Sequence, residues 1–157
     1  MSKIKSLEAL SKQIDKLKKA GKVVVFTNGC FDILHYGHAK YLQDAKNKGD
    51  CLVVAVNSDS SVKRIKGNFR PIVSQKNRLG LLAALSSVDY LILFNEDNPL
   101  RLIRRIKPDI LIKGADWNKA NIVGSDFVKG YGGRVLTIKL VKGLSTTSLI
   151  NKIVKAR

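Results

Sequence analysis

The chain is organised around the stretch Thr27-Asn28-Gly29-Cys30-Phe31-Asp32-Ile33-Leu34-His35-Tyr36-Gly37-His38. The residues before it, 23–26, are three valines and a phenylalanine, a short run that is typical of a buried strand. After it, apolar residues recur at helical spacing as far as Asn47-Lys48-Gly49, where a helix stop is expected. The stretch is therefore predicted to be a strand-to-helix loop. Both histidines of the chain lie at the helix entrance, at positions 35 and 38.

This histidine pair admits more than one interpretation. Both imidazoles can be exposed polar groups without a role. Because residues three apart share a face of a helix, they can also ligate a metal ion. A tetrahedral zinc site needs several protein ligands, and Cys30 is the only soft ligand nearby in the sequence. We therefore predict no tight protein metal site.

Phosphate chemistry is a third interpretation of the same stretch. A helix N-terminus exposes unpaired N–H groups and carries about half a positive charge, which attracts phosphate. Gly29 and Gly37 lack a Cβ atom and let a ligand approach the backbone closely. Two imidazoles can then donate hydrogen bonds to oxygens that gain charge as a P–O bond breaks.

The stretch also resembles the signature of a known enzyme family. Residues 29–38 read Gly-Cys-Phe-Asp-Ile-Leu-His-Tyr-Gly-His and contain the H-x-G-H signature of the nucleotidylyltransferase, or cytidylyltransferase-like, superfamily. In that superfamily the signature follows the first strand of a Rossmann-like domain. The resemblance covers nearly the whole chain from Val23 onward. It implies that residues 1–157 form a single nucleotidylyltransferase domain.

Length and composition set further bounds. A chain of 157 residues is expected to form one domain with a full core. It has no apolar run of about 18 residues and no signal-peptide pattern, so we predict a cytoplasmic protein without a membrane partner. Its two cysteines are too few to suggest a disulfide framework.

The net charge of +17 raises the alternative of a basic nucleic-acid-binding protein. The lysines are scattered, however, and aromatic residues make up only 6% of the chain, without the arrays on which single strands stack. The sequence shows no zinc-finger, basic-zipper or RNA-recognition pattern. A positive field that gathers nucleotides explains the sign of the charge equally well. We therefore expect no nucleic acid partner.

Apolar periodicity predicts the order of the elements. Residues 1–22 are expected to form an amphipathic helix arm, with seven lysines against two acids, that packs on the domain or on the partner subunit of a homodimer. Further buried strands are expected at 51–56, 90–94, 109–113 and 134–139. Helices are expected at 62–65, from Ser74 to about Ser86, after Asn98-Pro99, at 125–131 and after Ser145.

Alternating strands and helices predict an α/β fold, a Rossmann-like three-layer domain with a five-stranded parallel sheet. Ligands of such sheets bind beyond the carboxyl ends of the strands. The unusual stretches 27–38, 57–70, 113–117 and 142–147 all follow predicted strands, so they are expected to converge on one site. The dinucleotide fingerprint and the P-loop are absent from the sequence, so neither NAD nor a Walker-type phosphate grip is implied.

Within the superfamily, the chain is most similar to the heptose-1-phosphate adenylyltransferase domain of ADP-heptose synthesis, in a form without the sugar kinase domain. The likeness rests on positions 26–32, 57–59, 66–67, 70–71, 113–117 and 145–147. It implies transfer of AMP from ATP to a sugar 1-phosphate, namely D-glycero-D-manno-heptose 1-phosphate for lipopolysaccharide. A cytidylyltransferase of a small phosphorylated alcohol, such as glycerol 3-phosphate, is the alternative. Those relatives carry Arg-Thr-Glu-Gly where this chain has Leu140-Val141-Lys142-Gly143, which weakens that alternative.

The resemblance also implies roles for the matching residues. Catalytic roles fall on His35, His38 and Lys66. Nucleotide-binding roles fall on Thr27, Asn28, Gly29, Cys30, Phe31, Gly37, Arg78, Lys113, Gly114, Ser145, Thr146 and Thr147. Acceptor-binding roles fall on Asp32, Asn57, Asp59, Arg70, Asp116 and Trp117. Mg²⁺ is expected to enter with ATP, near Asp32 or Asp116.

Plainer interpretations of these residues remain open on the sequence alone. Lys66, Lys113 and Arg78 can be solvated charges, and an aspartate such as Asp59 can simply belong to a turn. Ser145 can be the N-cap of the last helix, which is compatible with phosphate binding beside it.

Overall fold

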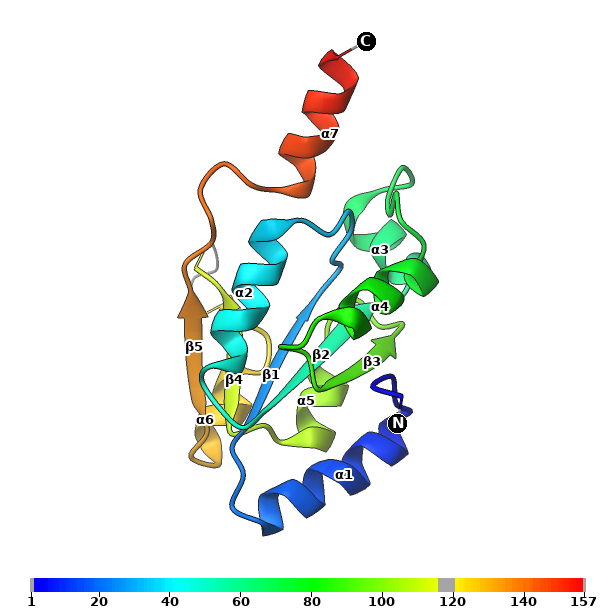
Figure 1. Ribbon diagram of the computed structural model, residues 1–157. Helices are drawn as coiled ribbons and strands as arrows, with labels where there is room; N and C mark the ends of the chain where they lie inside the picture. Colours follow the sequence, from blue (N-terminus) through cyan, green and yellow to red (C-terminus); the bar gives the residue numbers. More distant parts are fainter. Residues whose placement is uncertain (1, 116–120, 157) are drawn as a thin grey trace.

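One parallel sheet forms the centre of the molecule. The computed structural model describes residues 2–115 and 121–156. In these residues five strands pair in the order β3-β2-β1-β4-β5, and each pair of neighbours is parallel (Figure 1). The prediction of an α/β Rossmann-like fold with a five-stranded parallel sheet is confirmed. The strands are β1 (Val24–Gly29), β2 (Cys51–Asn57), β3 (Tyr90–Phe94), β4 (Ile110–Gly114) and β5 (Arg134–Ile138).

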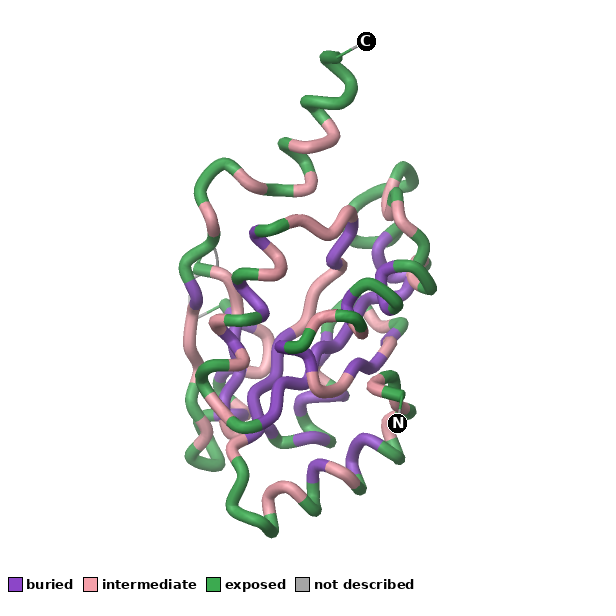
Figure 2. The backbone as a smooth tube through the Cα atoms, in the orientation of Figure 1, coloured by how far each residue is buried: buried purple, intermediate pink, exposed green. Residues whose placement is uncertain are grey.

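Helices cover both faces of the sheet and give the predicted three layers. One face is covered by α1 (Leu7–Lys19), α5 (Leu100–Ile106) and α6 (Ser125–Gly130), whose apolar residues join one core cluster. The other face is covered by α2 (Tyr36–Lys46) and α4 (Gln75–Ala84), which join a second cluster. Figure 2 shows the buried residues concentrated along the central strands between these layers.

The continuous apolar run of β2 follows from this double cover. Every residue of β2 is buried, with Val53 in one cluster and Val54 in the other. A strand covered on one face only would alternate apolar and polar side chains, whereas a strand covered on both faces needs apolar residues throughout. Each fully buried valine or leucine contributes roughly 1.5–3 kcal/mol.

The strand order places the ligand site. From β1 the chain proceeds to β2 and β3 on one side, and it then returns to β4 and β5 on the other side. The order therefore reverses between β1 and β4, and the crevice beyond their carboxyl ends is where sheets of this kind bind ligands. The ends of these two strands, Gly29 and Gly114, are at the predicted signature loop and the predicted 113–117 stretch.

The N-terminal arm differs from its prediction as a helix over residues 1–22. Helix α1 begins only at Leu7, where the hydroxyl of Ser6 accepts a hydrogen bond from the Ala9 N–H. The residues before it lie along β3: the Leu91 N–H donates to the Lys3 carbonyl, and the Lys5 N–H donates to the Leu91 carbonyl. β3 is an edge strand, so no further strand of the sheet pairs with its outer side. The segment before α1 lies there instead and forms hydrogen bonds with the backbone of β3.

Smaller differences concern element ends. α3 (Asp59–Lys66) is longer than the predicted turn at 62–65, because Ser58 caps it and accepts from the Ser61 N–H. Lys66 is consequently its last helical residue instead of a loop residue. α5 begins at Leu100, one residue later than predicted, with Pro99 at the N-cap. β1 continues to Gly29, so the first residues of the signature belong to the strand.

The last helix, α7 (Thr146–Lys155), extends away from the body of the protein (Figure 1). Each of its residues is at least partly exposed, including Ile153 and Val154 on its apolar face. Among the described residues, no helix has the length and apolar character that a membrane crossing requires.

Candidate active site

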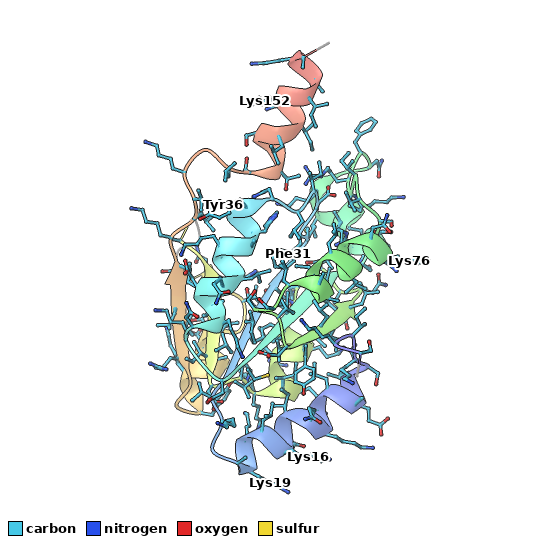
Figure 3. The ribbon with its side chains drawn as sticks, in the orientation of Figure 1. Lys16, Lys19, Phe31, Tyr36, Lys76 and Lys152 are labelled. Carbon is cyan, nitrogen blue, oxygen red and sulfur yellow. The ribbon has the colours of Figure 1, made fainter. Side chains whose placement is uncertain are left out.

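A pocket of about 170 Å³ lies at the reversal point, beyond the carboxyl ends of β1 and β4. Figure 3 shows Phe31, one of its lining residues, where β1 ends. Most of the lining comes from the signature loop and the start of α2, with a contribution from the end of β4. The residues that line it are Asn28, Gly29, Cys30, Phe31, His35, Gly37, His38, Tyr41, Lys113, Gly114, Leu140 and Leu144.

The signature loop has an unusual backbone. Phe31 and Ile33 both have φ of +49°, a region that side chains other than glycine rarely adopt. This conformation turns the Phe31 ring into the core, where it is only 6% exposed. A Cβ atom on Gly29 would lie 3.0 Å from that ring, so glycine leaves room for the close approach of the ring. Strained backbone of this kind clusters at functional sites.

The two imidazoles stack at the entrance of α2. Their ring centroids are 3.9 Å apart with an interplanar angle of 24°, and the His38 ring meets Phe31 edge-on at 5.5 Å. Both nitrogens of His35 and the Nδ1 of His38 are buried without a hydrogen-bond partner among the described residues. Buried polar atoms normally have partners, so these nitrogens are suited to ligand oxygens. Gly37 leaves room for His35: a Cβ atom there would lie 3.0 Å from its ring.

Burial keeps this pair neutral. Desolvation, helped by the neighbouring His35, lowers the pKa of His38 to about 4, although the Asp32 carboxylate opposes the shift. Desolvation also lowers the pKa of His35 below its usual value. Near pH 7 both rings are therefore uncharged in the absence of ligand, which allows them to stack. Each neutral ring donates one N–H.

Asp32, predicted to bind the acceptor, is 1% exposed and has internal partners. Its carboxylate accepts hydrogen bonds from the N–H groups of Ile72 and Val73 and forms an ion pair with Arg70 at 2.7 Å. Burial alone would raise the pKa of Asp32, but these donors outweigh it and lower the pKa below its usual value. Asp32 thus ties residues 70–73 to the signature loop, and Arg70, a second predicted acceptor residue, is held in that pair.

Arg78, predicted to bind nucleotide, is also internal. Its guanidinium is 1% exposed and donates to the carbonyls of Cys30 and Val73. It also pairs with the Asp59 carboxylate at 2.9 Å, and Asp59 in turn accepts from the Gln75 N–H. The structure therefore brings Arg78 and Asp59 together beneath the signature loop, outside the lining of the pocket. Asn57 lies nearby on β2 and donates to the hydroxyl of Ser61.

Four cations lie close enough to Cys30 to act on its thiol. Burial raises the pKa of the Cys30 thiol, while Lys66, Arg78, Arg70 and Lys113 act in the opposite direction. Lys113 lines the pocket, and its ammonium donates to the Asn28 carbonyl at 3.3 Å. Lys66 is exposed at the end of α3. Arg70 and Arg78 are held by Asp32 and Asp59, whereas Lys113 places positive charge in the pocket itself, which suits a polyphosphate.

The connection from β5 to α7 lies beside the same pocket. Leu140 and Leu144 line it, and Leu144 packs over Gly37. Ser145 caps α7 in a capping box with Ser148, as its position in the sequence predicted. The Thr146 hydroxyl donates to the Asp32 carbonyl at 2.6 Å, whereas Thr147 is exposed. Three predicted nucleotide-binding residues are thus near the pocket but outside its lining.

Comparison with known proteins places the chain in a family. A family model described as cytidylyltransferase-like matches residues 26–152. The chain belongs to the cytidylyltransferase-like family. The match includes the H-x-G-H signature and the Ser145-Thr146-Thr147 stretch. The family predicted from these residues is confirmed.

Several curated relatives of this cytidylyltransferase-like chain carry the name bifunctional protein HldE. The one from Geobacter metallireducens is 52% identical over 155 residues, which are 99% of this chain and 32% of that protein. The one from Campylobacter fetus subsp. fetus is 54% identical over 138 residues, which are 88% of this chain and 29% of that protein. The chain thus spans about a third of the length of these relatives.

Solved structures share the cytidylyltransferase-like fold. A lipopolysaccharide core biosynthesis protein from Thermoplasma volcanium matches with a TM-score of 0.64 and 35% identity, covering 78% of this chain and 98% of that one. A pantoate-beta-alanine ligase from Francisella tularensis matches with a TM-score of 0.66. At 15% identity, over 99% of this chain and 78% of that one, the ligase shows the fold alone.

The structure also places the remaining predicted site residues of this cytidylyltransferase-like chain. Thr27 is buried below the pocket, and its hydroxyl lies 2.8 Å from the hydroxyl of Tyr41. Asp116 and Trp117 lie outside the described residues. In the part of the chain that the structure describes, no three His, Cys, Asp or Glu side chains gather as metal ligands. The individual catalytic and binding roles stay predictions.

Sequence reasoning missed three lining residues. Tyr41 was identified only as an apolar position of the helix, although its hydroxyl also donates to the Ile112 carbonyl at 3.3 Å. Leu140 and Leu144 are ordinary apolar residues of a connection and carry no sequence signal for a site. The departure from Arg-Thr-Glu-Gly at residues 140–143 was the one available hint, because it marks this connection as different from that of related enzymes.

Proposed function

We propose that this chain transfers AMP from ATP to a sugar 1-phosphate and releases pyrophosphate, with D-glycero-D-manno-heptose 1-phosphate as the acceptor. Family membership supports nucleotidyl transfer as the reaction class. The relatives are called bifunctional, and this chain corresponds to about a third of them, as expected for the part that carries one of two functions. The structural relative in lipopolysaccharide core biosynthesis supports a sugar acceptor.

The single observation that carries the proposal is the stacked histidine pair. Three of its four ring nitrogens are buried at a helix N-terminus without hydrogen-bond partners in the described part of the chain, and both rings border a pocket whose lining includes the cation Lys113. Donors held in this way need no reorganisation when charge develops on the transferred phosphoryl group. His35 and His38 would contact the α-phosphate oxygens and the bridging oxygen that leaves with pyrophosphate.

The proposed reaction needs no general base. An oxygen of the sugar phosphate attacks the α-phosphorus of ATP in line, a new P–O bond forms, and the bond to pyrophosphate breaks. A phosphate monoester has a second pKa near 6, so about nine-tenths of it is already dianionic at pH 7. Catalysis then rests on positioning and on stabilisation of charge.

The remaining groups of the pocket would hold the polyphosphate. Lys113 and Lys66 supply positive charge, and the N-termini of α2 and α7 supply N–H groups and the positive ends of two helix dipoles. Leu140, Leu144 and Phe31 provide an apolar wall that suits the face of a base or a sugar. Mg²⁺ bound to ATP would neutralise part of the triphosphate charge. Because the Asp32 carboxylate already has three donors, Asp32 is unsuited to ligate that ion directly.

An assay of pyrophosphate release tests the proposal. The protein is incubated with ATP or CTP, alone or together with sugar 1-phosphates and glycerol 3-phosphate. Pyrophosphate should appear only when an acceptor is present, and ATP with the heptose phosphate should give the highest kcat/KM. Preference for CTP with glycerol 3-phosphate would instead establish the cytidylyltransferase alternative. Turnover without any acceptor would contradict both.

We also propose a cytoplasmic location and a homodimeric state for the enzyme. The first is supported by the absence of a membrane-crossing helix among the described residues and by the need for ATP. The second is implied by the family resemblance, and analytical ultracentrifugation tests it directly.

A further inference from the structure

Six cations gather at the end of the molecule that lies opposite the pocket. They occupy the last turns of two helices that pack against each other, α1 and α5, and the residue that caps α5. Figure 3 shows two of them, Lys16 and Lys19, far from Tyr36 at the pocket end. We call this surface the basal patch. It comprises Lys16, Lys18, Lys19, Arg104, Arg105 and Lys107.

The residues of the basal patch adjoin one another and form no ion pairs among the described residues. The ammonium of Lys18 donates to the carbonyl of Lys107, which joins the ends of the two helices. Arg104 lies over the Phe127 ring, 5.9 Å from its centroid. Within the described ranges, none of the six takes part in an ion pair, although eight such pairs form elsewhere. Asp15 is the nearest acid on α1 by sequence, and it too is exposed.

Attraction of nucleotides to the pocket does not explain this charge. β1 alone, with six residues, separates the two ends of the sheet by roughly 20 Å at about 3.3 Å per residue. The Debye length at 0.1 M salt is only about 10 Å, so the basal charges are screened at the pocket. Two helix C-termini supply about one unit of negative charge in total, which offsets a small part of six cations.

We propose that the basal patch docks the protein on an anionic lipid bilayer surface. Five of the six side chains belong to the last helical turns and one caps a helix, where backbone carbonyls, not N–H groups, are exposed. Exposed carbonyls repel phosphate groups, so helix C-termini do not bind individual phosphates closely. An anionic partner is therefore bound by the long, flexible lysine and arginine side chains, which respond to diffuse surface charge. Basic clusters beside a membrane act in this way, and each Lys or Arg adds roughly fivefold to the partition coefficient.

Nucleic acid is the less favoured polyanion. Single-stranded nucleic acids bind on exposed aromatic faces, whereas the Phe127 ring at this end has Arg104 over one face and Tyr131 against it edge-on. The hydroxyl of the neighbouring Tyr131 is occupied by a hydrogen bond to the Pro108 carbonyl. A docked molecule would point its pocket away from the bilayer, toward soluble substrates. This inference does not depend on the proposed function, because it concerns the opposite end of the fold.

Vesicle co-sedimentation tests the proposal on the full chain. Vesicles of phosphatidylcholine with 30% phosphatidylglycerol are compared with pure phosphatidylcholine, at about 50 mM and 500 mM NaCl. The patch variant Lys16→Glu/Lys19→Glu/Arg105→Glu is compared with the control Lys63→Glu/Lys76→Glu/Lys155→Glu. The control makes the same change in net charge at exposed lysines on α3, α4 and α7, and circular dichroism checks that both variants fold.

We expect the wild type to bind the anionic vesicles at low salt and to release them at high salt. The patch variant should lose on the order of a hundredfold or more in partition coefficient, since three cations are reversed. The control should lose less than about tenfold, because its charges lie away from the docking surface. Failure of the wild type to bind, or an equal loss in the control, would overturn the proposal. So would an unstructured RNA oligonucleotide that displaces the protein from the vesicles and binds through the same patch.

Discussion

His38 combines two properties that rarely occur together. Its imidazole is buried enough for the pKa to fall to about 4, and yet its Nδ1 has no hydrogen-bond partner in the described residues. An unpartnered buried nitrogen destabilises the fold unless a ligand contacts it. Phosphate oxygens would supply that contact, and their negative charge would raise the pKa of the ring again. A donor that strengthens as the substrate gains charge is what transition-state stabilisation requires.

The first prediction concerns catalysis by this side chain. His38→Ala should lower kcat about a hundredfold or more, since loss of one well-placed donor costs about 3 kcal/mol, and should change the KM for ATP far less. Tyr36→Ala is the matched control, because Tyr36 lies on the same turn but is 65% exposed. Steady-state kinetics decides between the outcomes. Full kcat in the His38 variant would exclude the role, as would stoichiometric zinc in the wild type.

The second prediction is a pH dependence of stability. His38 has a pKa of about 4 in the folded state against 6.5 in the unfolded chain. Between these values the unfolded state binds more protons, so the free energy of unfolding falls as the pH drops through this window. At pH 5 the loss from His38 amounts to about 2 kcal/mol relative to pH 7. Urea unfolding of the wild type and His38→Asn at both pH values measures it. Their stability difference should shift by this amount, whereas parallel curves would contradict the assignment.

At the scale of elements, three segments meet at the signature loop. Asp32 holds residues 70–73 through its carboxylate, and its carbonyl accepts from Thr146 at the start of α7. Arg78 joins the same loop to α3 through Cys30 and Asp59. The hydrogen bond of Thr146 and the packing of Leu144 over Gly37 therefore both hold the start of α7 near the histidines. Thr146 is accordingly a positioning residue.

The third prediction follows from that bond. Thr146→Val keeps the shape of the side chain but removes the donor, so the connection that bears Leu140 and Leu144 should shift against the pocket. We expect the KM for ATP to rise about fivefold to tenfold, in line with the loss of a hydrogen bond worth about 1 kcal/mol. Thr146→Ser retains the hydroxyl and should remain near wild type. Equal behaviour of the two variants in nucleotide titrations would show that the bond does not position α7.

The elements themselves were largely readable from the sequence. The apolar runs at 51–56 and 90–94 correctly predicted strands, because a strand covered on both faces must be apolar throughout. Helix caps gave the start of α7 at Ser145 correctly. The pairing of residues 3–5 with β3 was not predicted. It depends on the unpaired backbone groups of an edge strand that is distant in the sequence, and local periodicity carries no information about that strand.

Site residues were predictable by position but not by orientation. Asp32 and Arg70 were expected at the site because their stretches follow strands that end at one edge, whereas Arg78 was assigned only through the family resemblance. The sequence did not reveal that these side chains point into an internal network, because the burial of a charged side chain depends on partners that are distant in the sequence, such as Asp32 for Arg70 and Cys30 for Arg78. Leu140 and Leu144 were missed for a different reason. An apolar residue in a connection has no chemical feature that indicates a binding site, and its role is visible only once the folded structure shows the pocket.

At the scale of the whole molecule, stability and function lie in different places. The two core clusters lie on the two faces of the sheet and draw their buried residues from the strands, from helices α1, α2, α4, α5 and α6, and from nearby loops. α7 contributes no residue to either cluster and extends from the body beside the pocket (Figure 2). A segment that buries little adds little to the free energy of folding, so α7 is free to serve binding instead.

The last prediction tests this separation. Removal of residues 149–157 retains Thr146 and the capping box but deletes most of α7, including Ile153 and Val154, which are 63% and 66% exposed. Because those side chains bury little area against the rest of the protein, their removal should change the free energy of unfolding by less than about 1 kcal/mol and the Tm by less than about 4 °C. Leu82→Ala on α4 is the matched contrast, because Leu82 is fully buried and its truncation should cost about 2–5 kcal/mol. Differential scanning calorimetry measures both. A loss of stability in the shortened chain as large as that of Leu82→Ala would mean that α7 packs against a surface in solution, on its own chain or on a second copy.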